Sequence, residues 1–185
     1  MQIASLPKRK PNRLKEYDYN TPGAYFITIC TEKRKEVLSN INVGTGVLDC
    51  PDLQLYEYGK TANKIIKQLN GFYKNISIDN YVIMPNHIHF LISILCLDGQ
   101  SGTPVPTKKD NRNSVISKFV STFKRFCNKE YGKNIWQQRY YDHIIRNEQD
   151  YREIWEYIDN NPLKWEMDRF YNPILNLSEQ KKEGK

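Results

Sequence analysis

Two histidines separated by one residue stand at the start of an apolar stretch. Residues 87–95 (HIHFLISIL) are rich in β-branched side chains and predict a strand. Because side chains alternate across a strand, His87 and His89 share one face about 7 Å apart at the backbone, and Ile88 faces the core. Two imidazoles on one face can converge on a metal ion. Ordinary strand histidines fit the same pattern, so the motif alone leaves both interpretations open.

A tyrosine and an asparagine lie four residues apart near the end of a predicted helix over 147–161. Asn147 is a suitable N-cap, and Pro162 ends the helix. Tyr157 and Asn161 share a helix face, at the polar border of an apolar stripe. A nucleophilic hydroxyl and an amide ligand could therefore reach a metal together. A tyrosine that only packs its ring and shows its hydroxyl to water gives the same periodicity.

Other segments must position these groups. Strands are expected at 24–31, 76–84, 87–95 and 135–145, with a short strand after the turn at 33–35, and helices at 58–69, 114–129 and 147–161. This order predicts an α+β fold of the ferredoxin-like split βαβ type, in which helices pack on an antiparallel sheet.

The length of 185 residues suits one domain with surface insertions. We expect a basic N-terminal arm at 1–20, the domain at 21–165 and a polar C-terminal tail at 166–185. Stretches that contain Gly and Pro near 40–55 and 97–112 predict insertions or irregular loops, the second a candidate mobile segment.

Composition narrows the class of protein. Hydrophobic residues make up 39% and charged residues 26%, and no apolar run is long enough to span a membrane. Residues 1–15 lack the apolar region of a secretory signal, so we expect a cytoplasmic protein. The four cysteines are far apart and suggest neither a zinc knuckle nor a disulfide framework. The net charge of +7 and thirteen tyrosines suit phosphate binding and base stacking, as well as a plain solvated surface.

Three blocks resemble a known family. Residues 81–92 (YVIMPNHIHFLI), 136–147 (WQQRYYDHIIRN) and 150–162, with DYR and YIDNNP, are similar to the REP-associated tyrosine transposases. These are IS200-like members of the HUH single-tyrosine transposase superfamily. The likeness spans about residues 13–165, and the blocks stand in the family's order.

The resemblance implies a site and an activity. His87 and His89 would be metal ligands, Asn161 the amide that completes the shell, and Tyr157 the nucleophile. Relatives in simple insertion sequences carry glutamine at the position of Asn161. The metal would be Mg²⁺ or Mn²⁺, whose remaining positions can accept a phosphate oxygen. The expected reaction cleaves and rejoins single-stranded, hairpin-flanked DNA through a 5′-phosphotyrosine, in a bacterial, nucleoid-associated protein that acts as a monomer or homodimer.

Cationic residues could grip the DNA backbone, although a solvated surface explains each of them equally well. The candidates are Lys8, Arg9, Lys10, Arg13, Lys118, Lys124, Arg125, Arg139 and Arg146. His143 is interpreted as structural.

Other functions remain open on these residues. A transposase-derived regulator could bind hairpin DNA without cutting it. A metal-dependent nuclease or phosphoesterase could use water as the nucleophile. Two-histidine phosphoesterases need two separated His-x-Ser/Thr motifs, whereas this chain has one His-x-His. Relaxases usually place the tyrosine before the histidine pair, and replication initiators keep the order found here.

Overall fold

An antiparallel sheet of four strands organises the chain. The computed structural model describes residues 17–42, 52–96 and 114–171. The strands are β1 (Gly23–Cys30), β4 (Ile76–Ile83), β5 (His87–Ile94) and β6 (Tyr141–Ile144), in the order β4-β5-β1-β6. This order is that of a split βαβ sheet, so the predicted α+β class is confirmed.

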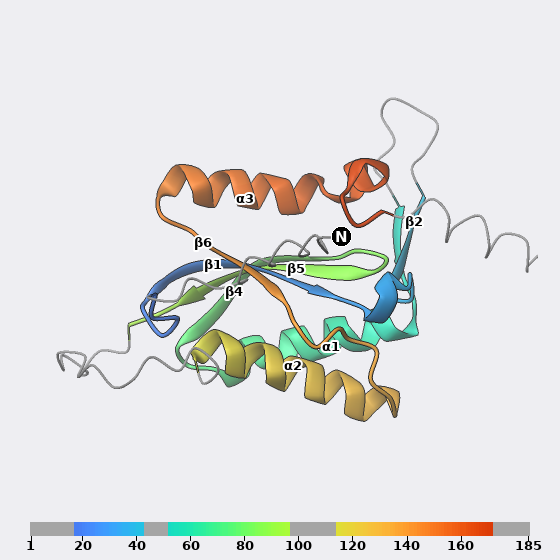
Figure 1. Ribbon diagram of the computed structural model, residues 1–185, viewed down its shortest axis with the longest axis horizontal. Coiled ribbons are helices and arrows are strands. Elements are labelled where there is room, and N and C mark those ends of the chain that lie inside the picture. The colour runs from blue at the N-terminus through green and yellow to red at the C-terminus, as the bar shows by residue number, and fades with distance from the viewer. Residues whose placement is uncertain (1–16, 43–51, 97–113, 172–185) are drawn as a thin grey trace, which may run out of the picture.

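Helices cover both faces of the sheet. Helices α1 (Glu57–Phe72) and α2 (Val115–Tyr131) pack together below the sheet, and α3 (Glu148–Asn160) crosses above it (Figure 1). Each predicted helix is present, extended or shortened by one to three residues at its ends. The Asn147 side chain accepts a 2.9 Å hydrogen bond from the backbone N–H of Asp150, which confirms the predicted N-cap of α3.

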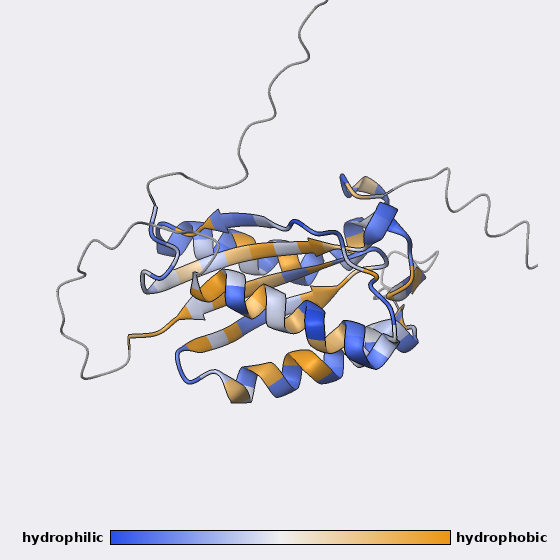
Figure 2. Cartoon of the chain, turned by 60° about the horizontal axis from the view of Figure 1, so that its bottom comes forward, coloured by the Kyte–Doolittle hydropathy of each residue, from blue (hydrophilic) through white to orange (hydrophobic). Residues whose placement is uncertain are grey.

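The main core lies between the sheet and the α1–α2 layer. Alternate residues of β5, Ile88, Phe90 and Ile92, are fully buried there against the apolar faces of both helices. Figure 2 shows these faces as orange segments along helices whose other sides are blue. Because side chains alternate, the remaining residues of β1 and β5 must face α3. The sheet therefore has one purely apolar face and one face that carries polar groups.

Two segments differ from their predicted form. In the stretch expected as an irregular loop, β2 (Ser39–Asn42) pairs antiparallel with β3 (Asp52–Leu55). A strand was predicted over 135–145. Residues 141–144 form β6, and Trp136 makes an isolated antiparallel bridge to Thr31. Residues 135–137 instead run past the end of β1, where the N–H of Gln137 donates to the carbonyl of Cys30 at 2.9 Å. A local apolar pattern does not reveal that this segment leaves the sheet.

The chain stays ordered beyond the expected boundary at residue 165. The 3₁₀ segment η3 (Pro162–Met167) continues from α3, and Phe170 is buried. An apolar cluster formed by Ile41, Met84 and Trp165 anchors this segment against the sheet. Among the described residues, no helix is long and apolar enough to cross a membrane. The basic arm to residue 16, the 97–112 insertion and residues 172–185 lie outside the described residues.

Candidate active site

The histidine pair lies buried between the sheet and α3. His87 and His89 point away from the main core, and both are at most 1% exposed. Their Nε2 atoms are 2.9 Å apart. In the sheet register, Thr28 of β1 stands directly opposite His89 and Cys30 opposite His87. Because His87 and His89 alternate with Ile88 along β5, their rings lie on one face of the sheet, as the alternation of side chains predicts.

Hydrogen bonds fix the orientation of both rings. Asn86 Nδ2 donates to the carbonyl of Phe170 at 2.9 Å, so its Oδ1 is left to accept from His87 Nδ1 at 2.8 Å. His87 Nδ1 is then the protonated nitrogen, and Nε2 carries the lone pair. Thr28 Oγ1 lies 2.9 Å from His89 Nδ1 and can hold that ring in the same tautomer. Both Nε2 lone pairs thus become available to a metal ion.

Tyr157 and Asn161 approach the histidines from α3. The Tyr157 hydroxyl lies 3.4 Å from His89 Nε2 and donates a long hydrogen bond of 3.3 Å to Asp168 Oδ2. The residue is 40% exposed, so part of Tyr157 borders the solvent. Asn161 is buried and donates from Nδ2 to the same carboxylate oxygen at 3.3 Å.

Asp168 is a member of the site that the sequence interpretation missed. Its Oδ1 accepts a 2.6 Å hydrogen bond from the backbone N–H of Phe170, which leaves Oδ2 facing Tyr157 and Asn161. Ligand atoms of His87, His89 and Asp168 all lie within 4.8 Å of one another. The residue follows Pro162, where no helical or strand period continues, so no sequence pattern connected it to the motif.

These groups fit a divalent metal ion. Two ligands about 2.1 Å from an octahedral ion at right angles are about 3.0 Å apart, close to the separation of the histidine nitrogens. The buried Oδ1 of Asn161 has no hydrogen-bond partner among the residues that the structure describes. Such an unsatisfied acceptor normally costs about 1–3 kcal/mol, and a cation would satisfy it. Imidazole, amide and carboxylate groups are ligands suited to hard or borderline divalent metals.

Burial governs the electrostatics of the site. It lowers the pKa of His89 to about 3 and that of His87 well below its ordinary value, with the charge of the neighbouring imidazole as a further cause for His87. Both rings are therefore neutral and able to bind a metal. The pKa of Tyr157 is raised, first by burial and then by the negative charge of Asp168.

The predicted DNA-binding cations occupy different places. Lys118, Lys124 and Arg125 are on α2, on the sheet face opposite the histidines. Lys124 donates from Nζ to the carbonyl of Gln137 at 2.7 Å and, at 3.3 Å each, to those of Gln138 and Arg139. Arg139 and Arg146 are exposed on either side of β6. The four cations of the N-terminal arm lie outside the described residues.

His143, interpreted as structural from the sequence, is separate from the histidine pair. It lies in β6, and its Nε2 is 3.0 Å from the Asp150 carboxylate of α3. Asp150 also accepts from the backbone N–H of Arg146. The contact therefore ties β6 to the start of α3.

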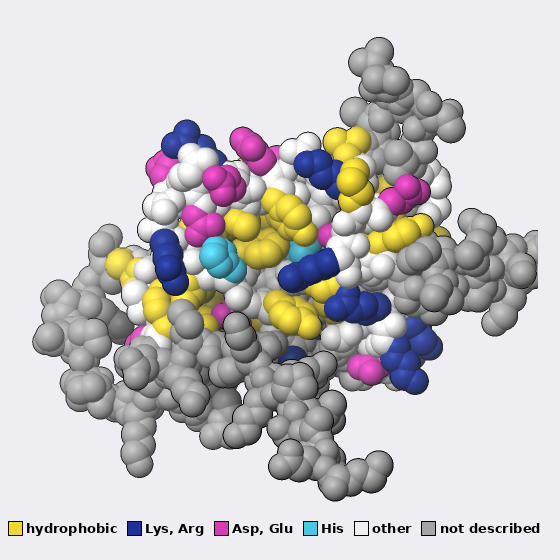
Figure 3. All heavy atoms as spheres, turned by 45° about the horizontal axis from the view of Figure 1, so that its top comes forward, with side chains coloured by type: hydrophobic (Ala, Val, Ile, Leu, Met, Phe, Trp, Pro, Cys, Tyr) yellow, Lys and Arg dark blue, Asp and Glu magenta, His cyan; other side chains and the backbone are white. Residues whose placement is uncertain are grey.

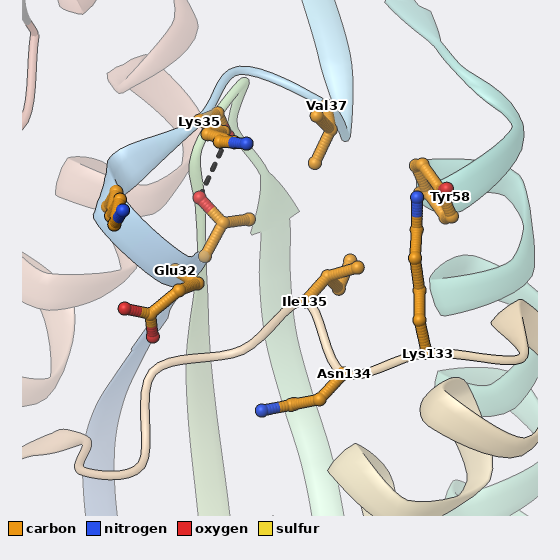
Figure 4. Close-up of a pocket in the computed structure, with 9 residues that line it drawn as sticks. Glu32, Lys35, Val37, Tyr58, Lys133, Asn134 and Ile135 are labelled. Atoms are coloured by element: carbon orange, nitrogen blue, oxygen red, sulfur yellow. Dashed lines mark hydrogen bonds between the residues drawn. The ribbon is translucent and has the colours of Figure 1, made fainter.

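A pocket of about 310 Å³ lies apart from these groups (Figure 4). It is enclosed by η1 (Glu32–Arg34), the start of α1 and the chain after α2. Figure 4 shows Val37 and Ile135 on its walls and Lys133 reaching across toward Tyr58. The ammonium of Lys133 is 5.2 Å from the centre of the Tyr58 ring. None of the histidine or tyrosine groups of the site lines this pocket.

Comparisons with known proteins identify relatives of this chain. The chain is 35% identical to an uncharacterised protein of Haemophilus influenzae, over 91% of this chain and 96% of that protein. It is 32% identical to the REP-associated tyrosine transposase of Escherichia coli, over 79% of this chain and 70% of the relative. No family model matches the sequence.

A solved structure shares the fold. The structure of a REP-associated tyrosine transposase bound to a REP hairpin matches with a TM-score of 0.54 and 24% identity, and the match covers 82% of this chain and 74% of that one. At this identity the likeness bears on the fold, whose sheet and helix layers the two proteins share.

Proposed function

Because the chain belongs to the REP-associated tyrosine transposases, we propose that it cleaves and rejoins single-stranded DNA beside hairpins, with Tyr157 as the nucleophile. The close grouping of His87, His89, Tyr157 and Asp168 carries this proposal. A buried imidazole pair with a partly exposed phenol at its edge suits phosphoryl transfer better than simple DNA binding. The hairpin substrate is proposed because a REP-associated tyrosine transposase of the same fold has been solved bound to a REP hairpin.

His87, His89 and Asn161 would hold the metal, with Asp168 beside them. When bound, Mg²⁺ or Mn²⁺ would supply Lewis acidity at a phosphate oxygen and orient that phosphate. The partnerless Oδ1 of Asn161 supports its role as a ligand. Asn86 and Thr28 keep the two rings turned with Nε2 toward the same point.

Tyr157 would perform the covalent step. Its phenolic oxygen forms a bond to phosphorus, the bond from phosphorus to the 3′ oxygen breaks, and the phenol proton leaves so that a 3′-hydroxyl is released. A second DNA 3′-hydroxyl can reverse this exchange, which keeps the energy of the phosphodiester and requires no ATP. The hydrogen bond to Asp168 supports a role for this carboxylate in orienting the phenol before attack.

Cationic residues outside the metal site are proposed to contact the DNA backbone. We infer that the cations of the expected arm at 1–20, together with Arg139 and Arg146, both exposed, contact the DNA backbone. The cations of α2 could contact DNA only away from the metal site, since they lie on the other face of the sheet. The oligomeric state proposed is a monomer or homodimer.

An adduct assay tests this function. Purified protein is incubated with Mn²⁺ and a labelled hairpin oligonucleotide from beside its own gene, and the products are separated under denaturing conditions. A protein–DNA adduct is expected from the wild type and from Tyr151→Phe, a control on the same helix. It should be absent from Tyr157→Phe and in the presence of chelator. Binding without any adduct would instead support the non-cutting regulator.

A further inference from the structure

Two arginines share one aromatic ring beside the histidine pair. The guanidinium carbon of Arg34 lies 4.1 Å from the centre of the Phe170 ring, and that of Arg169 lies 4.5 Å from it. The same ring is 4.7 Å from the His87 ring, centre to centre. Because both distances are measured to the same ring centre, the two guanidinium carbons cannot lie farther apart than the sum of 4.1 and 4.5 Å. Both charges also lie near His87, a proposed metal ligand. Figure 3 shows dark-blue cationic side chains beside a largely covered cyan imidazole on this face.

Neither guanidinium is neutralised within the described ranges 17–42, 52–96 and 114–171. The ion pairs found there join other residues, and the neighbouring Asp168 directs its oxygens to Tyr157, Asn161 and the Phe170 N–H. Two like charges in such proximity repel each other, and an anion between or beside them removes that cost. The guanidinium groups of Arg34 and Arg169 are therefore suited to bind an anion.

The backbone of Arg34 is held in an unusual conformation. Lys33 and Arg34 both have φ of 55°, in the left-handed region that residues other than glycine seldom adopt. Such conformations are strained and persist where the surroundings enforce them. The Thr31 hydroxyl enforces this turn, because it donates to the carbonyls of Lys35 and Asn86 at 2.8 and 3.0 Å. The turn connects the strand end next to His87 with the guanidinium that stacks on Phe170.

We propose that Arg34 and Arg169 form a clamp for the scissile phosphodiester of single-stranded DNA, an inference that rests on the proposed function. A guanidinium offers two parallel N–H donors that match two phosphate oxygens. Contact with the Phe170 ring restricts each guanidinium and lowers the entropy lost on binding. The clamp holds the negative charge that grows on the equatorial oxygens while the Tyr157 oxygen attacks. Both charges lie near the site, because the Phe170 ring that each contacts is 4.7 Å from the His87 ring.

The first test measures binding without chemistry. Tyr157→Phe protein in EDTA is titrated with the hairpin oligonucleotide at several salt concentrations. Arg34→Gln and Arg169→Gln should each weaken binding about tenfold. The slope of log K against log salt should fall in magnitude in each variant, and by about 0.7 in the double variant Arg34→Gln/Arg169→Gln, the value for one single-strand phosphate contact. Lys67→Gln, which removes an exposed charge on α1, should leave both quantities unchanged, and Arg34→Lys should keep most of the slope. Slopes unchanged in both arginine variants would overturn the clamp.

The second test identifies the phosphate. Oligonucleotides with one uncharged methylphosphonate, moved one position at a time, are bound to the parent protein and to each arginine variant. When the methylphosphonate stands at the phosphodiester that the wild type cleaves, an arginine variant should lose no further affinity relative to the parent protein. The uncharged linkage and the arginine substitution remove the same contact. Coupling at a distant phosphate, or at none, would overturn the proposal. If the wild type forms adduct while no coupling is found, only the clamp fails. If the wild type forms no adduct, the proposed function fails instead.

Discussion

The side-chain amide of Asn86 donates a 2.9 Å hydrogen bond to the backbone carbonyl of Phe170, which lies 84 residues later in the chain. The other end of the same amide accepts from His87 Nδ1. Asn86 thus links the backbone of Phe170, which follows Asp168 and Arg169, to the His87 ring that we propose as a metal ligand. The short segment from 168 to 170 belongs to the site as much as the histidine motif does.

Removal of Asn86 should therefore loosen the site. Asn86→Ala leaves the His87 Nδ1 and the Phe170 carbonyl without buried partners, which should lower the free energy of unfolding by about 2–3 kcal/mol. Affinity for Mn²⁺ should fall about tenfold to a hundredfold, as is typical when the partner of a metal-binding histidine is removed. Denaturant unfolding and calorimetric titration measure the two effects. Asn160→Ala, an exposed site on α3, is the control and should change neither by much.

Thr28 offers a subtler test of ring orientation. Thr28→Val keeps the shape but removes the oxygen that lies 2.9 Å from His89 Nδ1. The ring loses its fixed tautomer, so Mn²⁺ affinity should fall about tenfold. Thr28→Ser restores the hydroxyl and should recover most of the affinity. If calorimetry gives the same affinity for the valine and serine variants, the hydroxyl has no part in orienting His89.

The histidine face was predictable from the sequence because a strand has a period of two. His87, Ile88 and His89 alternate between the two faces, as expected for residues in a buried strand. The proximity of Tyr157 and Asn161 followed in the same way from the helical period. Local periodicity therefore indicated which side chains share a face, and the order of the elements gave the class of fold.

Other parts of the site depend on contacts between distant segments. Thr28 meets His89 only through the register of β1 against β5, and Arg34 meets Phe170 only after the chain has turned at the end of β1. The segment from 135 to 140 has the composition of a strand, yet Lys124 binds its carbonyls beyond the sheet. No pattern within one segment encodes such pairings, because they depend on tertiary packing.

Lys124 is expected to act on stability more than on DNA. Lys124→Met removes the ammonium that binds three consecutive carbonyls, which should cost about 1–3 kcal/mol of unfolding free energy. Lys118→Met, at an exposed position of the same helix, should cost less than about 0.5 kcal/mol. Urea unfolding compares the two variants. Equal stabilities would show that the contacts of Lys124 contribute nothing.

The buried thiol of Cys127 should make stability depend on alkaline pH. Burial raises its pKa to about 12 from an ordinary 9.0. Between these values the thiol ionises in the unfolded chain and stays protonated in the folded one, so stability is intact below pH 9 and falls as the pH rises toward 12. Cys127→Ala lacks this effect.

The advantage of the wild type over Cys127→Ala in urea unfolding should therefore shrink above pH 9, by up to about 1.4 kcal/mol per pH unit. Cys96→Ala, at an exposed position, is the control, and its difference from the wild type should stay small. A constant advantage over Cys127→Ala from pH 8 to 11 would contradict the prediction.

Two glycines of α1 should respond oppositely to the same substitution. A Cβ at Gly59 would stand 2.0 Å from the carbonyl oxygen of Leu38, which is itself fixed by a 3.0 Å hydrogen bond from the Tyr56 N–H. Gly59→Ala must therefore move α1 away from the start of β2, at a cost of about 3 kcal/mol. A Cβ at Gly71 meets nothing within 4 Å, so Gly71→Ala should stabilise the helix by up to about 1 kcal/mol. Denaturant unfolding of both variants checks the pair, and a Gly59→Ala protein as stable as Gly71→Ala would refute the close approach of α1 to Leu38.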